Sequence, residues 1–194
     1  RFINLKTKMI KIGLTGSLAS GKTTASKIIS NRRGPLFSAD KEVKKLYMQK
    51  SFKRLIAKRF KFQLKNSFKK EIKKRILKKK KNLKKLEKII HPLVRKEMFI
   101  FLKKNQKKNF LFLEIPLLIE SKLAKYFDVI IFIKSKKNLR LKRFMLRGGS
   151  SDLFSILDNH QIKDSKKMKF CDHIVVNNKS LSVLKKNLSN ITYL

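Results

Sequence analysis

The stretch Ile10–Thr24, which reads IKIGLTGSLASGKTT, decides the fold of this chain. Its opening residues IKIGL form a short apolar run, which is typical of a buried strand. Gly16–Thr23 (GSLASGKT) then matches the pattern G-x-x-x-x-G-K-[ST]. The helical spacing of Ala25, Ile28 and Ile29 predicts a helix directly after the loop. A strand, a glycine-containing loop and a helix in this order predict a phosphate-binding P-loop rather than a structural turn.

The chemistry of a P-loop indicates which residues would hold a nucleotide. Glycines let several backbone N–H groups point at one phosphate, and the helix N-terminus adds positive potential. We expect Lys22 to reach the β- and γ-phosphates and the Thr23 hydroxyl to ligate Mg²⁺. The expected nucleotide-binding residues in this loop are Gly16, Ala19, Ser20, Gly21, Lys22, Thr23 and Thr24.

Further apolar runs predict an α/β fold for the rest of the chain. Strands are expected at Leu36–Phe37, Asn109–Ile115, Asp128–Ile133 and His173–Val176. Helices are expected at Lys136–Leu146, from Ser151 as a capping residue through Ile162, and at Leu181–Ile191. Because a strand–helix–strand opening requires parallel strands, we predict a five-stranded parallel sheet flanked by helices, which is the P-loop kinase fold.

Residues 41–104 differ from the rest, because they contain no glycine and a single proline, Pro92. Apolar residues recur there at spacings of three and four, which indicates helices with very basic outer faces. We therefore predict a nucleotide-binding core of residues 9–45 and 105–194, with a lid at about 147–166 after the Gly148-Gly149 break. Residues 46–104 would be a helical acceptor-binding insertion, and residues 1–8, ahead of the first Met, a non-native or disordered extension.

The net charge is extreme: the chain has 52 Lys and Arg residues but only 12 Asp and Glu, which gives a formal net charge of +40. Such an excess favours polyanionic partners, with nucleic acid foremost. However, the lysines are spread along the whole chain, and Lys, Asn, Ile and Phe all have A/T-rich codons. Compositional bias of the genome is therefore the alternative, and on that interpretation we expect no specific nucleic-acid partner.

Apolar residues make up 42% of the chain and 15 of them are Phe, so a sizeable core is expected rather than a disordered basic tail. The one cysteine, Cys171, excludes an internal disulfide framework and indicates a reducing compartment, which predicts a cytoplasmic protein. We find no secretory signal and no apolar run near the roughly 18 residues that a membrane span needs. We therefore expect no membrane partner.

A P-loop by itself does not separate kinases, GTPases and ATPases. The chain has no N-K-x-D motif for reading guanine, no helicase motifs, and is short for a motor. An arginine-rich lid and a helical insertion fit a small-molecule kinase, in which the lid closes over ATP. A kinase for a nucleoside monophosphate or another metabolite, and a nucleic-acid-binding P-loop protein, remain as alternatives.

Several segments carry a more specific resemblance. They are Ile12–Thr24 (IGLTGSLASGKTT), Leu36–Asp40 (LFSAD), Leu86–Arg95 (LEKIIHPLVR), Glu114–Glu120 (EIPLLIE), Leu141–Arg147 (LKRFMLR), Gln161 and Cys171–Asn177 (CDHIVVN). In this order they resemble the dephospho-coenzyme A kinase family. The resemblance runs from about Met9 to Ile191, and HPLV, PLLIE and CDHIVVN are far more specific than the P-loop.

The resemblance implies a reaction in which ATP phosphorylates the ribose 3′-hydroxyl of dephospho-CoA, giving CoA and ADP, with Mg²⁺. Asp40 would lie just past the second strand, at the sheet edge where ligands sit in open α/β folds. There it would accept the hydroxyl proton or orient the hydroxyl for in-line attack. The alternative is that Asp40 caps a helix starting at Lys41. The protein is expected to act on small molecules as a monomer or small homo-oligomer.

The resemblance also assigns residues outside the P-loop. Arg147 and Arg143 would neutralise charge on the transferring phosphoryl group and ATP; a solvated helix face, or a structural contact for Arg143, is the alternative. Glu114 would join Thr23 at the Mg²⁺ site, unless it is only a strand-end carboxylate. With Asp40, His91 and Lys69 would bind the acceptor, although packing of the insertion also explains His91.

Four positions depart from the family pattern. Ser17 and Ala19 stand where its P-loop has glycine, and Ser38 replaces the first Asp of its Asp-Ala-Asp signature. Lys69 stands where an Arg is usual. Since Lys22, Thr23 and Asp40 are all present, these departures bear on acceptor affinity more than on the reaction.

Overall fold

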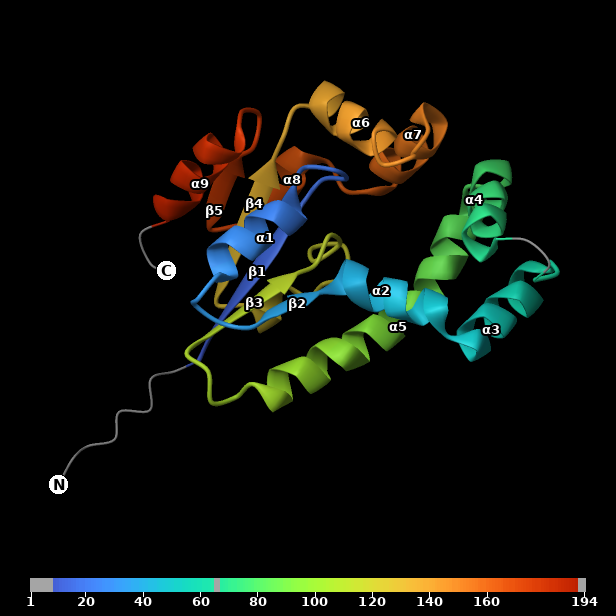
Figure 1. Ribbon diagram of the computed structural model, residues 1–194, viewed down its shortest axis with the longest axis horizontal. Helices are drawn as coiled ribbons and strands as arrows, with labels where there is room; N and C mark the ends of the chain where they lie inside the picture. The colour runs from blue at the N-terminus through green and yellow to red at the C-terminus, as the bar shows by residue number, and fades with distance from the viewer. Residues whose placement is uncertain (1–8, 65–66, 192–194) are drawn as a thin grey trace.

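The computed structural model describes residues 9–64 and 67–191, so the extension predicted for residues 1–8 lies outside the described residues. Within them, five strands form one sheet in the order β2-β3-β1-β4-β5, and every pairing is parallel (Figure 1). The strands are β1 (Ile10–Gly16), β2 (Leu36–Ser38), β3 (Phe110–Glu114), β4 (Val129–Lys134) and β5 (His173–Val176). The predicted five-stranded parallel sheet is confirmed.

The central strand β1 leads directly into the P-loop and is paired on both sides. It pairs with β3 on one side and β4 on the other, with Ile12 opposite both Phe112 and Val129. Ile12 and Leu14 are fully buried in an apolar cluster beneath helices α1 (Lys22–Ser30) and α9 (Leu181–Ser189). A parallel sheet needs both faces covered, and the other face packs against the second half of a long helix, α5 (Lys81–Lys104).

The remaining helices connect the strands. They are α2 (Ala39–Met48), α3 (Lys50–Phe60), α4 (Phe68–Lys78), α6 (Lys137–Met145), α7 (Ser151–His160), α8 (Asp164–Met168) and the short 3₁₀ helix η1 (Ala124–Tyr126). The cap of α7 was predicted one residue late, because Ser150, not Ser151, accepts the Leu153 amide through its hydroxyl, at 3.4 Å.

The helices after β2 have an apolar core of their own. Helices α3 and α4 pack with the first half of α5 and extend away from the sheet (Figure 1). Their buried side chains are Phe52, Ile56, Phe60, Phe68, Ile72, Ile76, Leu83, Leu86 and Ile90. The second half of α5 instead buries Met98 against the sheet. The helical insertion therefore shares one continuous helix with the core, and its division at residues 46–104 stays a prediction.

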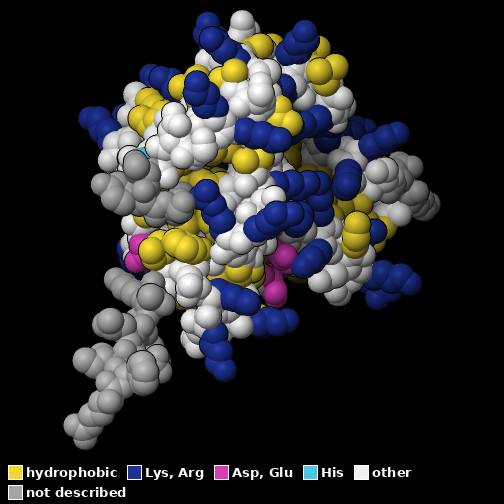
Figure 2. Space-filling view, turned by 60° about the vertical axis from the view of Figure 1, so that its left-hand side comes forward, with side chains coloured by type: hydrophobic (Ala, Val, Ile, Leu, Met, Phe, Trp, Pro, Cys, Tyr) yellow, Lys and Arg dark blue, Asp and Glu magenta, His cyan; other side chains and the backbone are white. Residues whose placement is uncertain are grey.

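The face of the molecule seen in Figure 2 carries its basic residues widely spread. Figure 2 shows lysine and arginine side chains over most of the visible face, interrupted by apolar side chains and few carboxylates. Among the helices of the described residues, none has both the length and the hydropathy needed to cross a bilayer. This dispersion is what the compositional interpretation of the charge predicts.

Candidate functional site

The P-loop lies between the end of β1 and the start of α1. Gly21 has a φ of 95°, and a Cβ atom built on it would lie 2.1 Å from the amide nitrogen of Asn177. That nitrogen donates to the Ser20 carbonyl at 2.9 Å, just beyond the end of β5. Only glycine fits there, because both the backbone conformation and the close approach exclude a side chain.

Two departures from the family pattern have a structural counterpart in this loop. Ala19 has a φ of 57°, a left-handed conformation that is costly for a residue with a Cβ atom. The Ser17 hydroxyl donates to the Asp164 carboxylate at the start of α8. The serine therefore ties the P-loop to the segment that follows the lid, a contact that glycine cannot make.

Lys22 is buried at the first position of α1, with 6% of its surface exposed. Its ammonium group donates to the carbonyls of Gly16, at 3.0 Å, and Ser17, at 2.7 Å. Burial lowers the pKa of Lys22 to about 8, although the carboxylates of Asp40 and Glu114 act in the opposite direction. A cation held in this way, next to the free amides of a helix N-terminus, suits a phosphate ligand.

Ser20 supplies independent support for a ligand in the P-loop. Its hydroxyl is buried, and within the described residues it has no hydrogen-bond partner. A buried polar atom without a partner costs stability unless something satisfies it. A phosphate oxygen in the loop would provide that partner, so the residues present fit a bound nucleotide.

Glu114 ends β3 and is fully buried among hydroxyl groups. It accepts hydrogen bonds from Thr23 Oγ1 at 2.5 Å and from Ser38 Oγ at 2.9 Å, with Ser26 Oγ at 3.5 Å. The hydroxyl of Ser38 stabilises the buried carboxylate, whereas an Asp at this position would place a second negative charge beside it. The serine at position 38 therefore suits a buried Glu114 carboxylate better than the aspartate of the family pattern would.

Asp40 lies in the first turn of α2, which begins at Ala39. The alternative in which Asp40 caps this helix is wrong, since Ser38 occupies the capping position. Asp40 is exposed to solvent at the edge of a cavity, although neighbouring protein atoms partly desolvate its carboxylate. This desolvation raises its pKa above the usual 3.8, with Lys22 opposing and Glu114 adding to the shift.

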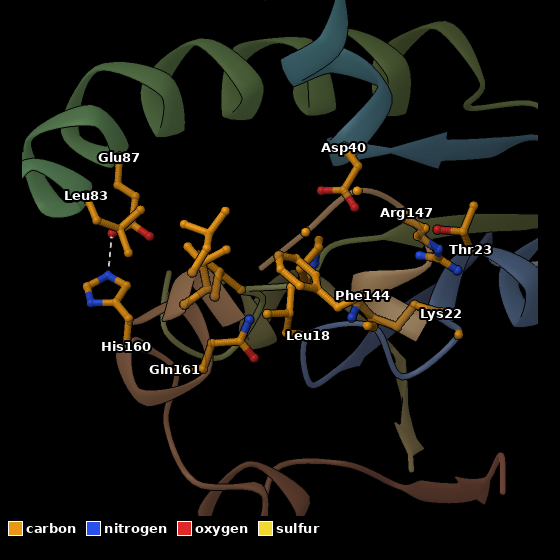
Figure 3. Close-up of a pocket in the computed structure, with 18 residues that line it drawn as sticks. Leu18, Lys22, Thr23, Asp40, Leu83, Glu87, Phe144, Arg147, His160 and Gln161 are labelled. Carbon is orange, nitrogen blue, oxygen red and sulfur yellow. Dashed lines mark hydrogen bonds and ion pairs between the residues drawn. The ribbon is translucent and has the colours of Figure 1, made fainter. Parts of the chain in front are cut away.

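A cavity of about 500 Å³ joins the P-loop, α2, α5 and the lid. Figure 3 shows Lys22 and Thr23 of α1, Asp40 of α2 and Arg147, which follows α6, facing the same space. Of the predicted site residues, this cavity is lined by Ala19, Gly21, Lys22, Thr23, Asp40 and Arg147. The structure thus brings the predicted base, the P-loop lysine and one lid arginine together.

A second cavity of about 400 Å³ adjoins the first and is mostly apolar. Its lining includes Phe37, Val43, Tyr47, Leu86, Ile90, Val94, Met98, Ile115 and Leu123. Asp40 lines both cavities, so it stands where they meet. His91 lines the second cavity, and burial lowers its pKa, which favours the neutral imidazole. Burial also raises the pKa of Tyr47 to about 12.

Two of the predicted site residues, Arg143 and Lys69, line neither cavity. The guanidinium of Arg143 donates to Ser135 Oγ at 3.0 Å and to the carbonyls of Asn177, at 3.1 Å, and Ser20, at 3.5 Å. It therefore joins the end of β5 to the P-loop backbone. Lys69 is exposed on α4 and outside both cavities. The roles given to Arg143 in ATP binding and to Lys69 in acceptor binding stay predictions; Arg143 contacts the P-loop backbone, whereas Lys69 lines neither cavity.

The structure also adds residues that the sequence reasoning missed. Arg95 lines the second cavity, and Glu87 lines both. Glu87 Oε2 lies 2.7 Å from Nε2 of His160, at the end of the lid helix α7. Arg95 and Glu87 stood within the LEKIIHPLVR segment, but no local pattern signals a partner 73 residues away.

Comparison with known proteins agrees with this geometry. Residues 10–182 match the family model for dephospho-CoA kinase. A dephospho-CoA kinase of Bartonella quintana is 35% identical over 88% of this chain and 90% of its own length. One from Zymomonas mobilis is 30% identical and covers 95% of both chains. The similarity therefore extends through the core, the insertion and the lid.

Solved structures give the same result. A dephospho-CoA kinase from Campylobacter jejuni superposes with a TM-score of 0.57, at 27% identity over 92% of this chain and 93% of its own. A Thermus thermophilus protein superposes with a TM-score of 0.72 at 24% sequence identity, over 94% of this chain and 95% of its own. A shikimate kinase from Bacteroides thetaiotaomicron superposes with a TM-score of 0.52 at 14% identity, over 93% of this chain and 95% of its own. The last two show the shared fold alone. With the family match across most of its length, this chain belongs to the dephospho-CoA kinase family.

Proposed function

We propose that this chain transfers the γ-phosphoryl group of ATP to the ribose 3′-hydroxyl of dephospho-CoA, releasing CoA and ADP. The single observation that carries the proposal is the position of Asp40 at the junction of two cavities. One cavity contains the P-loop, and the other is an apolar space between α2, α5 and the segment that follows β3. A phosphoryl donor in the first and a nucleotide acceptor in the second would meet at this carboxylate.

The donor side follows from the P-loop. The phosphates of ATP would lie over the N-terminus of α1, where the amides and the Lys22 ammonium stabilise negative charge. Lys22 would exchange its two carbonyl partners for phosphate oxygens. Since phosphate charge favours the protonated amine, ATP binding would raise the pKa of Lys22 from about 8.

The Mg²⁺ that accompanies ATP in such kinases would be held by Thr23, with Glu114 behind it. Among the described residues no group of three or more His, Cys, Asp or Glu side chains could bind a metal alone, so phosphates and water would complete the site. Thr23 donates its hydroxyl hydrogen to Glu114, which leaves its oxygen lone pairs free for a cation. The ion, when bound, would neutralise phosphate charge.

On the acceptor side, the apolar cavity would hold the adenosine portion of dephospho-CoA. Asp40 would accept the proton of the 3′-hydroxyl, whose oxygen attacks the γ-phosphorus in line. The bond from the γ-phosphorus to the bridging oxygen breaks, and ADP leaves. Lys22 and Arg147 would stabilise the charge on the phosphoryl oxygens during transfer.

The proposal is tested by coupled ADP release with dephospho-CoA, its 3′-deoxy analogue, AMP and shikimate as separate acceptors. Turnover with dephospho-CoA alone, together with conversion to CoA by mass spectrometry, is the expected result. Turnover with the 3′-deoxy analogue would place the phosphate elsewhere on the acceptor. Preference for AMP or shikimate would replace the proposed acceptor by the alternative kinase class.

We place this reaction in the cytoplasm and expect a monomer or small homo-oligomer. The support is the free cysteine Cys171, whose thiol has its pKa raised to about 11 by burial. Sedimentation velocity of the pure protein measures the assembly state, and fractionation of the source cells locates it.

A further inference from the structure

Lys167 is a fully buried lysine in α8 that none of the roles above uses. Its ammonium nitrogen lies 2.6 Å from Glu120 Oε1 and 3.2 Å from Gln161 Oε1. A lysine buried this completely needs partners for its charge. Glu120 comes from the loop after β3, so the contact joins the sheet edge to the segment after the lid.

The lysine determines which way the Gln161 amide faces. An ammonium group has hydrogens to donate and no lone pair to accept with, so the atom of Gln161 beside it must be the carbonyl oxygen. The amide nitrogen then points the other way. Figure 3 shows that the Gln161 side chain extends from the end of α7 toward Leu18, with this nitrogen directed into the cavity.

The backbone around Gln161 is held from two further directions. On one side, His160 contacts Glu87 of α5 at 2.7 Å. On the other, the Ile162 amide donates to Glu120 Oε1 at 3.2 Å. Gln161 therefore has both a fixed position and a fixed orientation, and it presents two N–H donors to a cavity in which a ligand is expected.

We propose that Gln161 donates a hydrogen bond to an oxygen of the acceptor nucleotide, and that Lys167 with Glu120 is the positioning pair that orients its amide. This inference rests on the acceptor site proposed above. The acceptor is favoured over ATP because Gln161 follows His160, which is bonded to Glu87, and Glu87 also lines the apolar cavity. Gln161 itself lines the first cavity, where Figure 3 shows it beside Leu18 and on the side of His160, away from Lys22 and Thr23.

The first test compares Gln161→Glu and Gln161→Met in the full chain. The glutamate keeps the size and the contact with Lys167 but presents an acceptor where the amide presented a donor. Both variants are expected to raise the KM for dephospho-CoA about 10-fold, the worth of one hydrogen bond to a ligand, with the KM for ATP nearly unchanged. Asn159→Asp, an exposed residue of the same helix, adds the same charge as a control and should leave both values unchanged.

The second test asks whether Lys167 acts through Gln161. Lys167→Met combined with Glu120→Met removes both charges, so that no buried ion is left alone. The pair should raise the KM for dephospho-CoA in the wild-type background and add nothing in the Gln161→Met background. Lys167→Arg keeps a cationic donor and should preserve the wild-type KM. Melting curves show whether each variant is folded. If the Lys167 variants do not fold, the Gln161→Glu variant still tests the inference, because it leaves Lys167 unchanged.

Three results would overturn the inference: an unchanged acceptor KM in both Gln161 variants, a rise confined to the KM for ATP, or additive effects in the second test. Each differs from failure of the proposed function. If wild-type protein does not phosphorylate dephospho-CoA, the proposed function fails; if it does and the Gln161 variants behave as wild type, only the inference fails.

Discussion

Thr23 donates its hydroxyl to Glu114 across 2.5 Å, which joins the first turn of α1 to the end of β3. The two residues are 91 positions apart in the sequence. The contact explains how a P-loop threonine can be ready for a cation before one binds: its hydrogen is already directed at a carboxylate, and its lone pairs face away from it. Glu114 also influences Lys22, so this one buried carboxylate affects both charged parts of the proposed ATP site.

Replacing Lys22 by methionine should abolish turnover while the protein stays folded. The substitution removes charge stabilisation of the phosphates, for which we expect a loss of at least about 10³-fold in kcat/KM. Since burial lowers the pKa of Lys22 from 10.5 to about 8, the charged amine is disfavoured in the folded state. The melting temperature at neutral pH should therefore hold or rise. Steady-state rates and calorimetry on one preparation test this, and an active variant would refute the P-loop assignment.

Asp40→Asn should lower kcat by about 100-fold or more, with a small effect on the KM for either substrate. The amide keeps the shape of the carboxylate but cannot take the proton of the acceptor hydroxyl. Glu97→Gln, at an exposed position of α5, is the matched control for loss of one carboxylate. Rates measured by ADP release at saturating substrates decide the outcome, and an unchanged kcat would remove Asp40 from the chemistry.

The pH profile of kcat/KM for ATP should have an alkaline limb near pH 8, because Lys22 loses its charge as the pH rises through its pKa of about 8. Glu114 raises that pKa, so Glu114→Gln should move the limb to lower pH. The profile of kcat itself should show the limb at higher pH, since bound phosphates stabilise the ammonium form. If the alkaline limb of the Glu114→Gln variant stays at the wild-type pH, the Glu114 carboxylate does not influence the pKa of Lys22.

The same shift has a consequence for stability. The folded protein binds fewer protons at Lys22 than the unfolded chain between pH 8 and 10.5, so this residue contributes a gain in stability as the pH rises across that interval. Lys22→Met should therefore flatten the pH dependence of the unfolding free energy there. Urea titrations at several pH values compare the two proteins.

Ala19→Gly should stabilise the P-loop, because Ala19 holds a φ of 57° that glycine adopts without steric cost. We expect a gain of about 0.5 kcal/mol, since the relieved strain of 1–2 kcal/mol is partly offset by the greater freedom of glycine in the unfolded chain. Thermal unfolding with and without ATP measures the change. A clear fall in melting temperature would show that the alanine methyl group packs favourably.

The purified protein should bind nucleic acid weakly, without sequence preference, and should lose that binding at moderate salt. Dispersed lysines (Figure 2) release counterions, so log K falls with log salt. ATP binding should respond less, because it depends on direct contacts with the P-loop. Titrations of labelled RNA and of a fluorescent ATP analogue from about 50 to 300 mM salt test both statements. Tight, sequence-selective binding at high salt would support the nucleic-acid alternative.

The sequence alone determined the sheet and the catalytic loop. Local patterns suffice for these: an apolar run marks each strand, and the P-loop motif followed by helical spacing marks the nucleotide site, because the backbone conformation there depends on adjacent residues. The P-loop motif indicated Lys22 and Thr23, and the family resemblance added Asp40 and Arg147; all four line one cavity.

Only the tertiary structure decided which side chains act on one another across the chain. Ser17 meets Asp164, Ser38 meets Glu114 and Glu87 meets His160, at separations of 147, 76 and 73 residues. Arg143 could face ATP or brace the protein on sequence grounds, and the structure shows it in contact with Ser135, Asn177 and the Ser20 carbonyl of the P-loop. No local pattern specifies such pairs, because their geometry arises only when the folded chain brings distant strands, loops and helices together.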